Sequence, residues 1–95
     1  MAQVIAKIDG ASDGAEFSWD NKLVSLTDLG GGSFSGDVPA NDATPGIHVL
    51  GIDVHGAPND PWTATVTGLS MPLNFSGHMS SRRSDTTGDR FVEVL

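Results

Sequence analysis

Turn-forming residues interrupt this chain so often that little room remains for a helix. Its 95 residues include 12 glycines and 5 prolines, and only residues 15–29 and 78–87 form uninterrupted windows long enough for a helix. Ten of the 12 acidic residues are aspartate, which, like serine and asparagine, prefers turns and helix caps to helix interiors. The window 78–87 has no apolar stripe and is expected to form a loop. The composition therefore predicts an all-β protein.

Between these breakers, apolar and polar residues alternate with a period of two, which is the pattern of a half-buried strand. In residues 61–67, Trp62, Ala64 and Val66 alternate with threonines. The alternation recurs in four further segments: residues 4–9, 46–55, 71–79 and 89–95. Seven or eight short strands, spaced by roughly 8 to 12 residues, predict an antiparallel β-sandwich. Residues 1–95 have the length of a single domain.

Residues 15–29 allow two interpretations. Apolar residues there are spaced nearly as on one face of a helix. The residues at the start resemble an N-terminal capping box, and the glycine that follows could cap the C-terminus. Most of the residues between them are poor helix formers, however. The alternative is a hairpin with its turn at Asp20-Asn21 and strands over residues 16–19 and 22–27. The hairpin is favoured, and the helix stays open.

Two stretches of the chain resemble bacterial immunoglobulin-like modules. They are residues 34–39 (FSGDVP) and 44–56 (TPGIHVLGIDVHG). In those modules a Pro-Gly turn feeds a long strand of the form Gly-x-His-x-Leu-x-Ile-x-Val that ends at a glycine, as the second stretch does. The resemblance covers roughly a quarter of the chain. It implies an immunoglobulin-like sandwich with an adhesion, spacer or substrate-binding role, and it transfers no binding residue. An extracellular or cell-surface location, as part of a longer protein, would fit such a module.

Charge and composition exclude several classes of function. The formal net charge is −7, and the chain has no cysteine, which excludes disulfides, thiolate chemistry and cysteine-bound zinc. An acidic surface repels phosphate backbones, so we expect no nucleic-acid partner. The apolar runs are only a few residues long, so we expect no membrane insertion. Residues 1–7 lack the pattern of a signal peptide, and the sequence leaves the location of the protein open.

We expect no enzyme activity and no cofactor. Residues 32–36 only superficially resemble a nucleophile elbow and lack its spacing. Asp53 and His55 share one face of a predicted strand and could reach one zinc or copper ion, but a third ligand is needed. The histidines that could supply it are His48 and His78. The turn 9–14 offers oxygen ligands of the kind that calcium binds, but without the EF-hand spacing. For this turn and for the Asp53/His55 pair, solvated side chains are the simpler interpretation.

The leading hypothesis is a non-catalytic binding or adhesion module that recognises a protein or a carbohydrate through loops at one end of the sandwich. The candidate binding residues are Trp19, Asp20, Asn21, His55, Asn59, Asp60 and Trp62. Both tryptophans are expected in the core, because each shares a strand face with apolar residues; an exposed Trp19 would instead be a stacking platform for a sugar ring or an anchor for a protein partner. The alternative is a structural assembly subunit that forms homo-oligomers through its sheet edges. A small metal-binding enzyme ranks third.

The last segment, residues 91–95, is apolar in both alternating sets of positions, with Glu93 as its one polar residue. A strand of this kind is expected either inside the sandwich, with both faces buried, or at an edge in contact with another chain. The simplest such contact is a two-fold homodimer.

Overall fold

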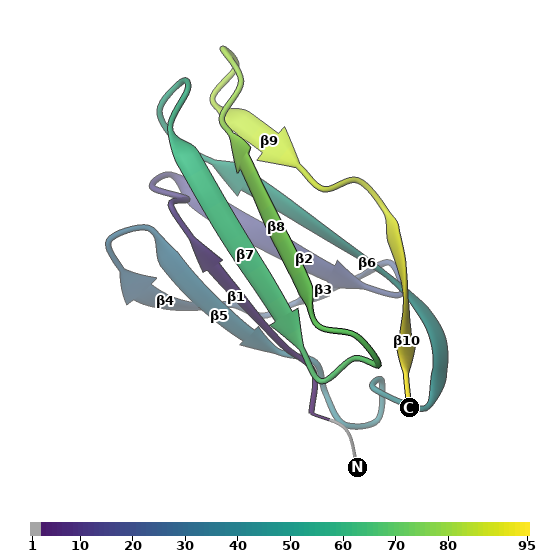
Figure 1. The fold of residues 1–95 in the computed structure, drawn as a ribbon. Helices are drawn as coiled ribbons and strands as arrows, with labels where there is room; N and C mark the ends of the chain where they lie inside the picture. The colour runs from purple at the N-terminus through teal and green to yellow at the C-terminus, as the bar shows by residue number, and fades with distance from the viewer. Residues whose placement is uncertain (1–2) are drawn as a thin grey trace.

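The period-two pattern forms ten strands in the computed structural model, which describes residues 3–95. The strands are β1 (Ile5–Asp9), β2 (Gly14–Trp19), β3 (Lys22–Val24), β4 (Thr27–Gly30), β5 (Ser33–Asp37), β6 (Gly46–His55), β7 (Pro61–Thr67), β8 (Leu73–His78), β9 (Ser84–Thr86) and β10 (Arg90–Val94). No helix occurs in the described residues, so the all-β prediction is confirmed (Figure 1). Likewise, no segment of that range forms an apolar helix of the length that crossing a membrane requires.

The predicted number of strands, seven or eight, was too low. Strands β3, β4 and β9 have only three or four residues each. Such strands are too short for an alternation of apolar and polar residues to be recognised in the sequence.

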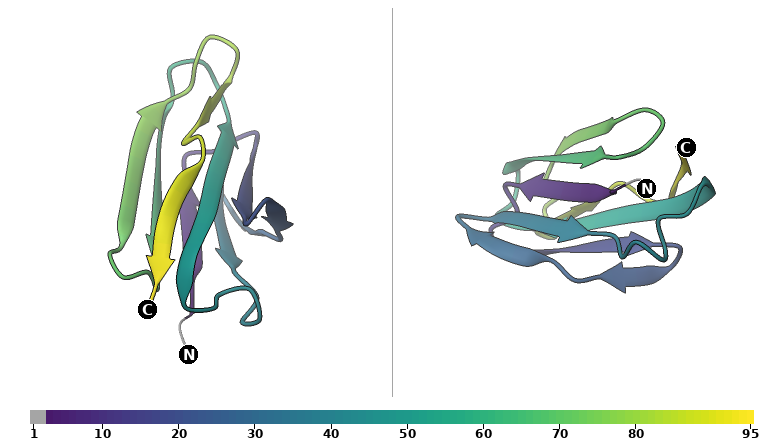
Figure 2. Two further views of the ribbon diagram at one scale, coloured as in Figure 1. Left: turned by 90° about the vertical axis from the view of Figure 1, so that its right-hand side faces the viewer. Right: turned by 90° about the horizontal axis from the view of Figure 1, so that it is seen from below.

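Two antiparallel sheets face each other, as the prediction of a sandwich requires (Figures 1 and 2). The first sheet has the strand order β4-β5-β1-β7-β8, and the second has the order β10-β6-β2-β3. Strand β6 is the longest, and two strands share one of its edges: β10 pairs with its first half and β9 with its last three residues. The N-terminal strands β1 and β2 also pair with later strands, β7 and β6 respectively.

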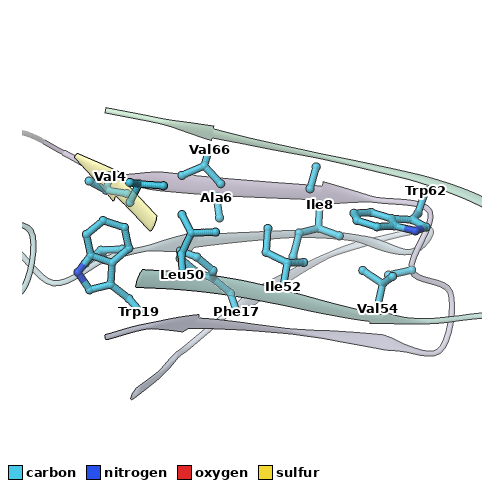
Figure 3. Close-up of a cluster of buried hydrophobic side chains, with 14 of the residues drawn as sticks. Val4, Ala6, Ile8, Phe17, Trp19, Leu50, Ile52, Val54, Trp62 and Val66 are labelled. Atoms are coloured by element: carbon cyan, nitrogen blue, oxygen red, sulfur yellow. The ribbon is translucent and has the colours of Figure 1, made fainter. Parts of the chain in front are cut away.

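Alternate residues of the facing strands fill the space between the sheets (Figure 3). The largest contributors are Val4, Ile8, Trp62 and Val66 on the side of the first sheet, and Phe17, Trp19, Leu50, Ile52 and Val54 on the side of the second. Each is at most 3% exposed. Complete burial of such a side chain contributes roughly 1.5–3 kcal/mol, so this layer is the main source of stability.

A hairpin rather than a helix forms at the start of residues 15–29, but its second strand is shorter than the predicted 22–27: β3 ends at Val24, and Thr27 begins β4 of the other sheet. Strand β2 pairs with β3, and Trp19 lies opposite Lys22 across the two-residue turn Asp20-Asn21. Both turn residues have positive φ, 52° and 66°. Positive φ at both central positions is the type I′ geometry, whose twist matches that of the strands, and aspartate and asparagine tolerate it well.

The C-terminal segment lies at the edge of the second sheet. Strand β10 pairs with β6 alone, and its inward residues Val92 and Val94 are 7% and 2% exposed. Phe91 and Leu95, in contrast, are each 81% exposed. The first expectation for residues 91–95, burial on both faces, is therefore wrong, because each sheet of a two-layer sandwich has only one face toward the core. The second expectation, contact with another chain at an edge, stays a prediction.

Candidate functional site

The loops predicted to form one binding end lie at opposite ends of the sandwich. Strand β2 runs antiparallel to β6, and its last residue, Trp19, lies opposite Leu50. The Asp20-Asn21 turn is therefore near the start of β6. The other predicted residues, His55, Asn59, Asp60 and Trp62, lie at or beyond the end of that strand. Leu50 and His55 are five residues apart on an extended strand, roughly 17 Å, so the expected shared end does not exist.

Trp19 is buried at the first of these ends. Its side chain is 1% exposed, and Nε1 donates a hydrogen bond to the carbonyl oxygen of Asp42 at 2.9 Å. One face of the indole stacks on His48, with ring centroids 4.8 Å apart. The core interpretation of Trp19 is therefore correct, and the indole has no free face for a sugar ring.

Asp20 binds neighbouring residues at the same end. Its Oδ2 accepts a hydrogen bond from Nδ1 of His48 at 2.7 Å, and its Oδ1 accepts one from the backbone N–H of Val49 at 3.1 Å. Partial burial acts to raise the pKa of Asp20, but the hydrogen bonds from His48 and Val49 outweigh it and hold the pKa below its ordinary value. The hydrogen bond to Asp20 in turn raises the pKa of His48 against the opposing effect of burial. Asp20 and His48 thus form a structural pair, while Asn21 is exposed at the turn.

Trp62 is buried at the opposite end, and there it joins the two sheets. It is 3% exposed, and its Nε1 donates a hydrogen bond to Oδ2 of Asp85 in β9 at 2.8 Å. The indole passes over Gly77, its cross-strand neighbour in β8. A Cβ atom at Gly77 would lie 2.5 Å from Oδ2 of Asp85 and 2.9 Å from Nε1 of Trp62. Because Gly77 has no side chain, there is room for the hydrogen bond between Trp62 and Asp85.

The loop between β6 and β7 is held by backbone hydrogen bonds. The N–H of Asn59 donates to the carbonyl oxygen of Met79, and the N–H of Met79 donates to that of Asp60. Asn59 has a φ of 67°, which asparagine tolerates better than most residues. Asn59 and Asp60 are exposed, but the aromatic residue predicted beside them, Trp62, is not.

Asp53 and His55 line a shallow depression on the outer side of the second sheet. Its volume is about 410 Å³, and Glu16, Ser84 and Thr86 are among the other residues that line it. Within residues 3–95, no three histidine, aspartate or glutamate side chains are arranged to hold a metal ion. His48 lies at the far end of β6, and the third histidine, His78, belongs to the first sheet.

The aspartate-rich turn between β1 and β2 has its carboxylates bound to different partners. Oδ1 of Asp9 accepts a hydrogen bond from the hydroxyl of Ser33 at 2.6 Å, and Oδ2 of Asp13 accepts one from Arg83 at 2.8 Å. The same turn, residues 10–14, also has the sequence Gly-x-Ser-x-Gly, which the sequence analysis overlooked. A nucleophile elbow leads from a strand into a helix, whereas this turn leads from one strand into another.

Exposed apolar side chains gather instead on the outer face of the second sheet. Phe91 of β10 lies directly opposite Val49 of β6, and Ile47 follows two residues before Val49 on the same face. Phe91 is 81% exposed and Ile47 is 67% exposed. We call these three residues the outer patch. Leu95, also 81% exposed, directly follows β10.

Sequence reasoning did not identify the outer patch. The signal was nevertheless present, because Ile47 and Val49 interrupt the otherwise polar or glycine positions on the solvent side of β6. Recognising it requires knowing that β10 pairs with β6 in the register that sets Phe91 beside Val49. Nothing local to either segment specifies that register.

Comparison with known proteins yields no relative: no family model matches the chain, and no curated protein or solved structure matches it either.

Proposed function

We propose that this chain is a non-catalytic protein-interaction module whose binding surface is the outer patch. The observation that carries the proposal is the exposure of Phe91 beside Val49 and Ile47 on one sheet face. Contiguous exposed apolar side chains mark contact surfaces, whereas isolated ones are ordinary. Exposed aromatic side chains are also the kind of residue that anchors protein interfaces.

The face is a better candidate than the end loops. The two loop clusters lie at opposite ends of β6, and the indoles that would have served them, Trp19 and Trp62, are buried. A sugar ring stacks on an exposed aromatic face, which neither tryptophan offers. These observations favour a protein over a carbohydrate as the partner.

The absence of catalysis is part of the same proposal. In the pair formed by Asp20 and His48, both ring nitrogens of His48 are hydrogen-bonded. One is bonded to the carboxylate of Asp20 and the other to the carbonyl oxygen of Thr44. An imidazole bound in this way has no nitrogen left to activate a nucleophile. The pair therefore supports a structural role better than a catalytic one.

We further infer an immunoglobulin-like arrangement. When β1, β2 and β5 are taken as strands B, C and E, strand β4 corresponds to D, β6 to F and β10 to G, and β3 corresponds to C′. The spatial orders B-E-D and G-F-C-C′ then match that fold. One departure is that the β7–β8 hairpin, from within the F–G connection, occupies the place of strand A beside β1.

Site-specific photo-crosslinking tests the proposed surface. A photoreactive phenylalanine analogue is placed at position 91 and, as a matched control, at Leu29, which is 54% exposed on β4 of the first sheet. In cells that produce the protein, we expect a discrete protein adduct from position 91 that disappears in the Ile47→Ser background. Equal adducts from both positions, or none from position 91, would contradict the proposal.

A glycan array and light scattering address the competing functions. We expect no glycan to be retained by the intact domain, and a particle mass equal to that of one chain. Retention of a glycan that survives Phe91→Ser would favour carbohydrate recognition. A dimer that Phe91→Ser dissociates would favour the assembly subunit.

A further inference from the structure

We propose that the outer face of the second sheet receives a cationic amphipathic polypeptide segment, with apolar side chains seated on the outer patch and lysine or arginine side chains around it. This inference rests on the proposed function and adds the chemistry of the partner. It is carried by the arrangement of charge around the outer patch.

The centre of this face is apolar. Val49 separates Ile47 from Gly51 along β6, and Phe91 borders them from β10. A Cβ atom at Gly51 would lie 3.1 Å from the hydroxyl of Ser18, so even a methyl group is a tight fit there. Gly51 therefore offers no hollow, and Phe91 is the exposed ridge against which apolar side chains of an extended segment can pack.

Four carboxylates surround this centre. Glu93 lies on the outward side of β10 opposite Ile47, and a carboxylate oxygen of Asp89 lies over Gly51, 3.7 Å from the place of its missing Cβ. Glu16 and Asp53 lie directly opposite each other on β2 and β6. Like charges in directly opposed positions of a sheet repel each other, so the sheet itself gains nothing from this last pair.

These carboxylates have no cationic partners within the described part of the chain. None of the four takes part in an ion pair there, whereas Lys22 binds Asp42 and Arg83 binds Asp13. Arg90 is directed toward the other sheet, with its guanidinium 5.7 Å from the ring centre of Phe75. Lys7 lies on β1 of the first sheet, and Arg82 lies in the loop between β8 and β9. The outer face is therefore apolar and negatively charged, and its complement is apolar and positively charged.

The depression beside the outer patch has a suitable size for one basic side chain. Glu16 and Asp53 line it together with Ser84 and Thr86. A guanidinium or ammonium group placed there would relieve the repulsion between the two carboxylates and gain hydroxyl acceptors. Val49 and Asp53 are four residues apart on β6, roughly 13 Å, so an apolar and a basic side chain four residues apart in one extended segment would reach both places.

A second copy of this chain is a poorer occupant. A two-fold contact through the same face would bring Glu93 and Asp89 toward their own copies in a chain of net charge −7. Edge-to-edge pairing of β10 is also obstructed, because the N–H of Ser70 already donates to the carbonyl oxygen of Glu93 on the open side of that strand. The outer face of the second sheet, rather than the edge of β10, is therefore the surface available to a partner.

A pair of synthetic probes tests the partner chemistry. One ten-residue peptide has valine at positions 1, 3 and 5, lysine at positions 7 and 9 and serine at the even positions, so that valine and lysine face the same side of an extended chain; its counterpart has glutamate in place of lysine. We expect the intact domain to bind the lysine peptide in calorimetry and to show no binding of the glutamate peptide. Phe91→Ser should weaken the affinity about tenfold, as the loss of an interface anchor does. Asp53→Asn should weaken it about threefold to tenfold and raise the melting temperature, because it removes one member of a repelling pair.

Matched controls separate this face from general acidity. Leu29→Ser removes an apolar side chain that is 54% exposed from the first sheet, and Asp37→Asn removes one exposed charge from β5. Both should leave the affinity within twofold. If Asp37→Asn weakens binding as much as Asp53→Asn does, the attraction is that of net charge alone and the inference is overturned. It is also overturned if neither peptide binds, or if ultracentrifugation finds a dimer that Phe91→Ser dissociates.

The crosslinking experiment distinguishes the failure of this inference from the failure of the proposed function. An adduct from position 91 whose partner contacts that position through a neutral or acidic segment would retain the protein-interaction function and overturn the cationic partner. Loss of the adduct would overturn both.

Discussion

Nδ1 of His48 lies 2.7 Å from Oδ2 of Asp20, where the start of β6 meets the turn between β2 and β3. The other ring nitrogen, Nε2, lies 2.6 Å from the carbonyl oxygen of Thr44. A carboxylate and a carbonyl oxygen are both acceptors, and only the imidazolium has two N–H groups to donate. The folded state therefore favours the charged form of His48.

We expect this pair to make the stability of the domain depend on pH. The pKa of His48 is raised above its ordinary value of 6.5, so the stabilisation is complete below pH 6.5 and is lost as the pH rises through the raised value. The pKa of Asp20 is lowered, so its contribution is present above pH 3.8 and is lost as the pH falls through the lowered value. Urea unfolding between pH 6 and pH 9 should show a falling free energy of unfolding.

His48→Gln should remove that slope and lower the free energy of unfolding by about 1–2 kcal/mol at pH 6. His55→Gln, at the other end of β6, is the matched control and should keep the slope. A slope of the same size in both variants would show that another group is responsible.

Gly77→Ala should destabilise the domain although it lies in a strand. The added methyl group would overlap Oδ2 of Asp85 and Nε1 of Trp62, so their hydrogen bond has to lengthen or break. Overpacking of this kind costs about 1–3 kcal/mol. The neighbouring change Ser76→Ala, at an exposed position of β8, should alter the free energy of unfolding by less than about 0.5 kcal/mol. Thermal melts of the two variants that coincide would contradict this account.

Asn21→Gly should stabilise the domain. Asn21 has a φ of 66° at the second central position of a type I′ turn, where glycine meets no steric cost. We expect a gain of about 0.5 kcal/mol in chemical denaturation. Asn74→Gly, within β8, should instead cost roughly 0.5–1 kcal/mol, because glycine in an extended strand loses more conformational freedom on folding.

The two faces of β10 should respond oppositely to truncation of their side chains. Val94→Ala removes two methyl groups from a side chain that is 2% exposed, and should lower the free energy of unfolding by about 1–3 kcal/mol. Phe91→Ser, at 81% exposure, should change it by no more than about 0.5 kcal/mol. Deletion of residues 91–95 should unfold the domain, because it removes the buried valines and the pairing with half of β6. A truncated chain that keeps its melting temperature would exclude a structural role for this strand.

The class of fold was predictable because its signals are local. Period-two alternation identified the buried faces of β6 and β7, and the alternation in residues 61–67 correctly assigned Trp62 to the core. The Asp20-Asn21 turn could be predicted because few residue pairs tolerate positive φ twice in succession. Each of these predictions needed only neighbours in the sequence.

The relative placement of segments was not predictable in the same way. The Asp20-Asn21 turn and residues 55–62 were assigned to one end, but the antiparallel pairing of β2 with β6 separates them by at least five residues of β6, roughly 17 Å. Residues 91–95 were expected either inside the sandwich or at an edge in contact with another chain; the alternation could not decide between them, and the structure places the segment at an edge with Phe91 exposed beside β6. Which strands pair, and in which register, depends on long-range packing that alternation alone does not encode.

The two tryptophans give the domain a separate optical probe at each end. Trp19 stacks on His48, and a protonated imidazole quenches indole emission, so its fluorescence should respond to the charge of that ring. Trp62 donates to the carboxylate of Asp85 and should instead report whether the second sheet stays joined to the β7–β8 hairpin. Single-tryptophan variants with phenylalanine at the other position would then follow the unfolding of each end independently, and any difference between their transitions would locate the part of the sandwich that opens first.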